Sequence, residues 1–98
     1  MTADRDPTIE ELVEQMRSIK VGQFVLSTAA TLASLAFAKL DAGELAEARL
    51  AIDAIGVLVP LLQGQIEDEA KRGLEQALAN LKLAYANAAS AASSGGSE

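Results

Sequence analysis

Four stretches of the chain repeat apolar residues three or four positions apart, the spacing of an α-helix that buries one face. The first predicted helix covers about residues 8–20, and its apolar positions are Ile9, Leu12, Val13, Met16 and Ile19. This stripe is narrow, about 120° of the circumference, as on a helix that covers a core with one side. Its start is predicted by Asp6-Pro7 or, alternatively, by a capping box of Thr8 with Glu11.

Two central helices, predicted over residues 23–41 and 44–62, are apolar over a much wider arc of about 240°. In the earlier one, the apolar residues form two groups: Val21, Phe24, Val25, Leu32 and Leu35, and then Leu26, Phe37 and Leu40. The later one also has two apolar faces: Leu45, Ala48, Ile52, Ile55, Val59 and Leu62, and then Leu50, Val57 and Leu61. Gly22 predicts a break before these helices, and Gly43 predicts the turn between them. Pro60 predicts an end or a kink, and Gln63-Gly64-Gln65 predicts the next turn.

The fourth predicted helix covers about residues 67–86 and is again one-sided. Its stripe consists of Leu74, Leu78, Leu81 and Tyr85, and three acidic residues, 67–69, occupy the first turn, where they favour the helix dipole. Residues 1–7 read as a polar lead-in, residues 8–87 as the helical domain and residues 88–98 as a disordered Ser/Gly/Ala tail. The pattern therefore predicts an all-α fold, a small bundle of about four helices.

The two wide helices carry more apolar surface than two one-sided helices can cover in a chain of 98 residues. The remaining cover must come from another subunit or from lipid. We expect another subunit, so that helices 23–41 and 44–62 are completed by a second copy of the chain. The residues expected at this oligomer interface are Phe24, Val25, Leu32, Leu35, Phe37, Ile52, Ile55, Val59 and Leu62.

The alternative is a membrane span, because residues 21–38 carry no charge and have about the length of a bilayer-crossing helix. The later wide helix argues against lipid, since Glu47, Arg49 and Asp53 lie within it. A charge at the centre of a bilayer costs about 2.5–3.5 kcal/mol on insertion scales. The two helices are better explained together as a buried pair.

The amino-acid composition excludes several common kinds of catalytic and metal-binding chemistry. The chain has no Cys and no His, so it has no thiolate nucleophile, imidazole base or zinc site of the usual kind. A net charge of −6 with scattered basic residues argues against nucleic-acid binding, which needs clustered Lys and Arg. The polar, acidic start lacks the features of a signal peptide, so we expect a cytoplasmic protein.

The remaining candidate residues have structural explanations beside the functional ones. Ser27, Thr31 and Ser34 either line a polar groove or are small residues whose hydroxyls bond to carbonyls one turn earlier. Asp53 is either a buried functional carboxylate or the partner of Arg49 on a polar strip. The acidic clusters 10–14 and 67–69 lack the loop of a calcium site, and helix capping and solubility explain them. We expect no catalytic, cofactor-binding or metal site.

Several motifs resemble DUF1844, a bacterial family of small helical domains of unknown function. They are Phe24-Val25-Leu26-Ser27, then Ala48-Arg49 followed by Ile52-Asp53, and then Gln63-Gly64-Gln65-Ile66 leading through Glu67-Asp68-Glu69 to Leu74, Leu78, Leu81 and Tyr85. The resemblance covers about residues 22–87, and the chain departs from it at residues 59–62, where the family is typically charged. It implies a small, soluble α-helical protein and implies no activity.

The sequence therefore predicts a non-catalytic interaction module that forms a homodimer or a higher homo-oligomer. An unknown protein partner is compatible with the same surface. The alternatives are a membrane-associated protein using residues 21–38 and a bundle that binds an apolar small molecule between its helices.

Overall fold

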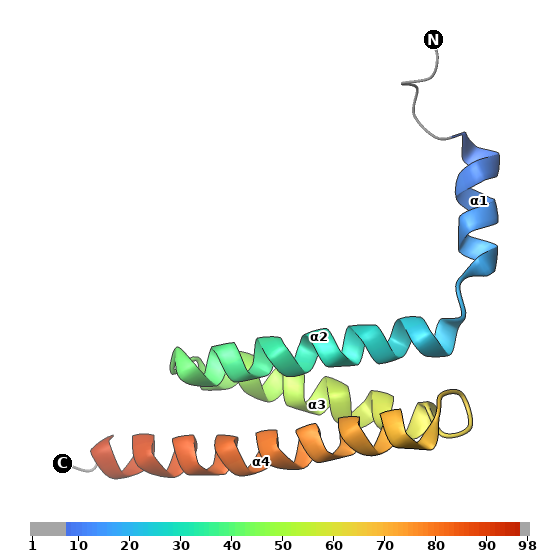
Figure 1. The fold of residues 1–98 in the computed structure, drawn as a ribbon. Coiled ribbons are helices and arrows are strands. Elements are labelled where there is room, and N and C mark those ends of the chain that lie inside the picture. Colours follow the sequence, from blue (N-terminus) through green and yellow to red (C-terminus); the bar gives the residue numbers. More distant parts are fainter. Residues whose placement is uncertain (1–7, 97–98) are drawn as a thin grey trace.

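The computed structural model describes residues 8–96, which form four α-helices, with no strand in that range (Figure 1). The helices are α1 (Ile9–Ser18), α2 (Val21–Asp41), α3 (Leu45–Leu61) and α4 (Asp68–Gly96). The predicted all-α class and the number of helices are confirmed. The predicted lead-in of residues 1–7 lies outside the described residues.

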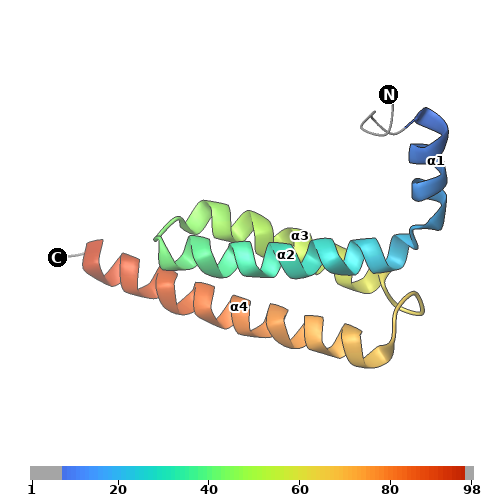
Figure 2. The ribbon, with the colours of Figure 1, turned by 45° about the horizontal axis from the view of Figure 1, so that its top comes forward.

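Three of the four helices pack together. α2 and α3 form an antiparallel hairpin, and α4 turns back to lie against both (Figures 1 and 2). α1 packs against none of the other three helices and projects from the start of α2 on the side away from α4. The folded unit is therefore a three-helix bundle with one helix standing off it.

Glycines with positive φ end the two central helices. Gly43 has a φ of 78°, and the Glu44 N–H beyond it donates to the Lys39 carbonyl, which closes the end of α2. Gly64, with a φ of 77°, turns the chain after α3. Pro60 lies in the last turn of α3, which ends one residue later at Leu61, so this proline marks the end of the helix. Local signals thus predicted both ends correctly.

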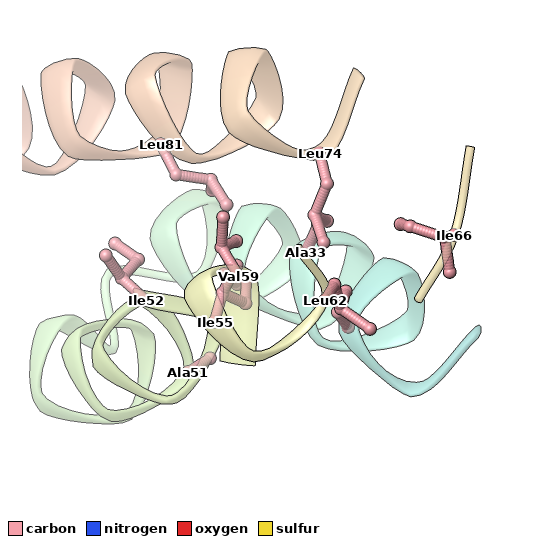
Figure 3. Packing of buried hydrophobic residues seen from close by; sticks show 11 residues of the cluster. Ala33, Ala51, Ile52, Ile55, Val59, Leu62, Ile66, Leu74 and Leu81 are labelled. Carbon is pink, nitrogen blue, oxygen red and sulfur yellow. The ribbon is translucent and has the colours of Figure 1, made fainter. Parts of the chain in front are cut away.

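The core is built from small residues on α2 and larger ones on α3 and α4. α2 contributes buried alanines, whose small size lets the neighbouring helices approach closely. The largest fully buried side chains are Ile55, Leu62 and Leu81. Figure 3 shows Leu81 reaching from α4 toward Val59 and Ile55 of α3, while Leu74 points toward Ala33 of α2. Each of the three packed helices thus presents its apolar face to the other two.

Gly22 does not break the chain, contrary to the expectation from the sequence. The break lies at Ile19 and Lys20, which are extended, and Gly22 is inside the first turn of α2. A Cβ atom at Gly22 would lie 2.9 Å from the carbonyl oxygen of Gln65 and 3.1 Å from its Cβ. The glycine is therefore a point of close approach between α2 and the α3–α4 loop.

We expect Gly22→Ala to lower the free energy of unfolding by about 1–3 kcal/mol, because the backbone of Gln65 must move. The matched control is Gly73→Ala on α4, where an added Cβ meets no atom within 4 Å. Removing a glycine from a helix interior without a clash stabilises by about 0.5–1 kcal/mol. Urea denaturation at one protein concentration measures both variants. Equal shifts of the same sign would contradict the close approach.

α4 is longer than predicted. It continues from residue 86 to Gly96, so the expectation of a disordered tail is wrong for residues 88–96, and residues 97–98 lie outside the described part. The segment after Tyr85 is rich in alanine, the strongest helix former, and the next glycine is Gly95. Ala88 and Ala89 are still half-buried, whereas residues 90–93 are exposed. Helix propensity here outweighed the low complexity of the composition.

Candidate interaction surface

The most prominent surface of the described residues is an apolar face on the α2–α3 hairpin. Large apolar side chains that stay exposed on these two helices include Val21, Phe24 and Leu35 of α2 and Leu50, Val57 and Leu61 of α3. Within α3 they recur at i, i+7 and i+11, which places them on one face of the helix. We call these six residues, together with Thr28, Thr31 and Ala54 between them, the outer face.

Both stripes of the outer face point away from α4. On α2, the residues that line a groove beside α4 are Leu26, Ala30 and Ala33. At 100° per residue, Phe24 and Leu35 lie roughly opposite Leu26 and Ala33. On α3, Ile52 lines a pocket that α4 shares, and Leu50 and Leu61 lie roughly opposite it. The two stripes therefore form one face of the hairpin.

The threonines on the outer face use their hydroxyl groups in hydrogen bonds within α2. Thr28 Oγ1 donates to the Phe24 carbonyl at 2.9 Å, and Thr31 Oγ1 donates to the Ser27 carbonyl at 3.0 Å. The predicted back-bond of Thr31 is confirmed, and that of Thr28 was not predicted. Because these hydroxyls are bonded within the helix, the methyl groups add to the apolar character of the face.

The residues predicted for the oligomer interface divide into three groups. Phe24, Leu35 and Phe37 are exposed, and Val25 and Leu32 are half-buried against the core. The four predicted residues on and just after α3 are buried in the core of the chain itself, which corrects their assignment: Ile52, Ile55, Val59 and Leu62. Sequence periodicity had shown two apolar faces on this helix, and α4 covers the one that had been assigned to a partner. Leu50, Val57 and Leu61 take their place on the surface.

Phe37 lies on a different side of α2 from Phe24 and Leu35. Its helical phase matches that of Ala30 and Leu26, which border the groove beside α4. This groove has a volume of about 260 Å³ and is lined mainly by alanines. Phe37 is therefore not part of the outer face.

α1 carries a second exposed apolar stripe. All of its residues are exposed, and so is Ile19 directly after it. The five residues of the predicted stripe are therefore all exposed: Ile9, Leu12, Val13, Met16 and Ile19. Its N-terminus is closed by the predicted capping box, in which Glu11 N–H donates to Thr8 Oγ1 at 3.1 Å and Thr8 N–H donates to Glu11 Oε1 at 2.9 Å. Backbone groups at both ends of α1 are therefore hydrogen-bonded within the helix and its caps. The apolar stripe, however, packs on no other helix of the chain.

Asp53 is exposed and pairs with Arg49, with 3.7 Å between Oδ2 and Nε. This is the structural alternative expected from the sequence, and such an exposed i,i+4 pair contributes about 0.3–0.5 kcal/mol. Both residues border an open pocket of about 200 Å³ beside Tyr85 and Lys82. Sites for small molecules occupy about 300–1,000 Å³ and enclose most of the ligand. This open pocket is smaller than such sites, so it gives little support to the predicted alternative of a bundle that binds an apolar small molecule.

The acidic residues of the described part, 8–96, form no group of three or more that converges on one point as metal ligands do. Glu14 instead pairs with Arg17 at 3.1 Å, and Glu75 with Lys71 at 2.8 Å. These contacts are between neighbours on the same helix.

α2 has the length and apolar composition of a membrane-crossing helix over Val21–Asp41. A buried core helix of a soluble protein can have the same length and apolar composition. In this structure α2 packs against α3 and α4 through its alanines and leaves Phe24 and Leu35 exposed.

The chain matches no family model, and no similar curated protein or solved structure was found. The resemblance to DUF1844 stays a prediction.

Proposed function

We propose that this protein is a non-catalytic helical interaction module that forms a homo-oligomer in the cytoplasm through its outer face. The observation that carries the proposal is the apolar face of the α2–α3 hairpin, which α4 leaves uncovered. Its two stripes contain no charged side chain. Exposed apolar patches of this kind mark interaction sites on soluble proteins.

A second copy of the chain is the partner that this face fits best. An apolar face without charges is complementary to itself, so a two-fold contact between two hairpins leaves no charge unpaired. The face would then lie between two α2–α3 hairpins, with each α4 on the outside. This proposal also accounts for the wide apolar arcs of α2 and α3 in the sequence.

The mass of the protein in solution tests the proposal. We expect light scattering after gel filtration at low micromolar concentration to give a multiple of the chain mass of 10.2 kDa. A folded monomer under these conditions would contradict it.

Membrane association through α2 is the second candidate, and the length and composition of Val21–Asp41 support it. Fractionation of expressing cells without detergent separates the two candidates. Recovery in the soluble fraction supports the interaction module, whereas recovery only from membranes with detergent supports the span. Membrane recovery would also give the outer face a different occupant, namely lipid.

A further inference from the structure

α1 is a short helix without any packing partner in its own chain. It has 10 residues, and none of them is buried. Isolated helices shorter than about 12–15 residues are marginal in water even when their sequence favours the helix. The capping box of Thr8 and Glu11 contributes about 1 kcal/mol, which does not replace packing. α1 therefore needs a surface for its apolar stripe to be a stable helix.

The linker holds α1 away from its own bundle. Ile19 and Lys20 are both extended, with ψ angles of 127° and 119°, and α2 starts directly after them. α1 leaves the bundle at the N-terminal end of α2 and projects on the side away from α4 (Figures 1 and 2). This is also the side on which the outer face lies. The two uncovered apolar surfaces of the chain therefore border the same space without touching.

We propose that α1 is an exchanged arm, which packs its apolar stripe on the α3 side of the outer face of a second copy of the chain, while the α2 sides of the two outer faces contact each other. This inference rests on the proposed function, because it requires the homo-oligomer, and it names the element that closes the interface. In a two-fold dimer each chain gives one arm and receives one.

The dimensions of the two surfaces agree. At about 1.5 Å per residue, α1 is about 14 Å long from Ile9 to Ser18, and the extended Ile19 adds one further residue to its stripe. From Leu50 to Leu61 the stripe of α3 is about 16 Å long. A narrow stripe on one helix also fits the groove between two others, as in ordinary helix packing. The arm thus has the length needed to cover the α3 side of the outer face.

The exposed apolar area is sufficient for a dimer that includes the arm. From their exposed fractions, the six large side chains of the outer face offer roughly 500–600 Å² of apolar surface per chain. A standard interface buries about 800 Å² per partner, of which about 500 Å² is apolar. The outer face alone reaches this value only if a partner covers all of it. The five side chains of the α1 stripe, which include Ile19 directly after the helix, add roughly 350–450 Å², so a dimer with exchanged arms exceeds this value without complete coverage of either surface.

The charges of α1 favour a protein surface over a lipid surface. Its polar side carries Glu10, Glu11 and Glu14 against Arg17, with Lys20 in the linker. Amphipathic helices that lie on membranes are rich in Lys and Arg, because the lipid surface of the cytoplasmic leaflet is negative. An acidic arm is repelled by such a surface.

Cross-linking between two differently tagged chains tests the arm directly, because the protein contains no cysteine of its own. One chain carries Met16→Cys on the α1 stripe, and the other carries Val57→Cys on the outer face. After mixing and subunit exchange, a short bismaleimide is added. We expect at least fivefold more cross-linked heterodimer than with the control pair of Met16→Cys and Leu83→Cys, since Leu83 is equally exposed but lies on α4. Equal yields of cross-linked heterodimer for the two pairs would overturn the proposal that α1 is an exchanged arm.

A second measurement uses the double variant Leu12→Glu/Met16→Glu. α1 packs on none of the other helices of its own chain, so the bundle should keep its helical circular dichroism. We expect the dissociation constant of the oligomer to rise at least tenfold. If it changes less than twofold, the arm is wrong and the homo-oligomer stands. If the unmodified chain is already a monomer, both the arm and the proposed function fail.

Discussion

Leu81→Ala is expected to lower the free energy of unfolding by about 3–5 kcal/mol. Leu81 has no exposed surface and reaches from α4 into the centre of the core, toward Ile55 and Val59 (Figure 3). Truncation to alanine removes these contacts and leaves a cavity that the helices cannot fill without separating. The core depends on few large side chains, because α2 contributes only alanines to its fully buried part. A loss of this size is a large share of the 5–15 kcal/mol that stabilises a typical domain.

Leu83→Ala is the matched control for this variant. It makes the same substitution in the same helix two residues later, where the side chain is 64% exposed. Leucine and alanine are both strong helix formers, so we expect a change within about 0.5 kcal/mol. Urea denaturation followed by circular dichroism measures both variants at one protein concentration, since unfolding of an oligomer depends on concentration. Similar losses for the two variants would show that Leu81 is not at the centre of the core.

Leu50→Glu is expected to dissociate the proposed homo-oligomer while leaving the chain folded. Leu50 is 68% exposed in the single chain and lies on the outer face, on the opposite side of α3 from the core. Glutamate keeps the helix propensity of leucine, so the bundle itself should be little affected. In the oligomer, however, each copy would place an unpaired carboxylate in an apolar contact, which costs several kcal/mol. We expect the dissociation constant to rise by about two orders of magnitude or more.

Leu83→Glu separates the effect of position from that of charge. It introduces the same side chain at an exposed leucine on α4, away from the outer face. Analytical ultracentrifugation over a range of concentrations gives the dissociation constant for each variant. We expect Leu83→Glu to keep the dissociation constant of the unmodified protein within about threefold, as for a surface substitution outside the contact. If Leu83→Glu dissociates the oligomer and Leu50→Glu does not, the interface lies on α4 and the outer face is free.

The elements of this fold were predictable because their signals are local. The capping box of Thr8 with Glu11, the glycines at 43 and 64 and the proline at 60 each act on the backbone within a few residues. Their meaning does not depend on the rest of the chain. The exceptions are the start of α2 and the end of α4. Gly22 was read as a local break although a distant loop requires it, and the alanines after Tyr85 were read as a disordered tail although they favour the helix.

The interaction surface was only half predictable. Periodicity showed that α2 and α3 each have two apolar faces, and this alone indicated that one chain cannot cover all of them. It did not say which face would stay uncovered. Of the residues predicted at the oligomer interface, Phe24 and Leu35 of α2 are exposed, whereas those of α3 are buried and Leu50, Val57 and Leu61 are exposed instead.

The sequence alone was sufficient to predict a helical protein, the positions of its helices to within a few residues over most of the chain, and a surplus of apolar surface. These properties follow from backbone propensity and from residue spacing along one helix. The packing of the helices was needed to show that Ile55 faces inward and Leu50 outward, that Gly22 lies close to Gln65, and that α1 packs on no other helix. Each of these features depends on which helices pack together. Helix packing depends on how well the surfaces of helices that are far apart in the sequence fit each other.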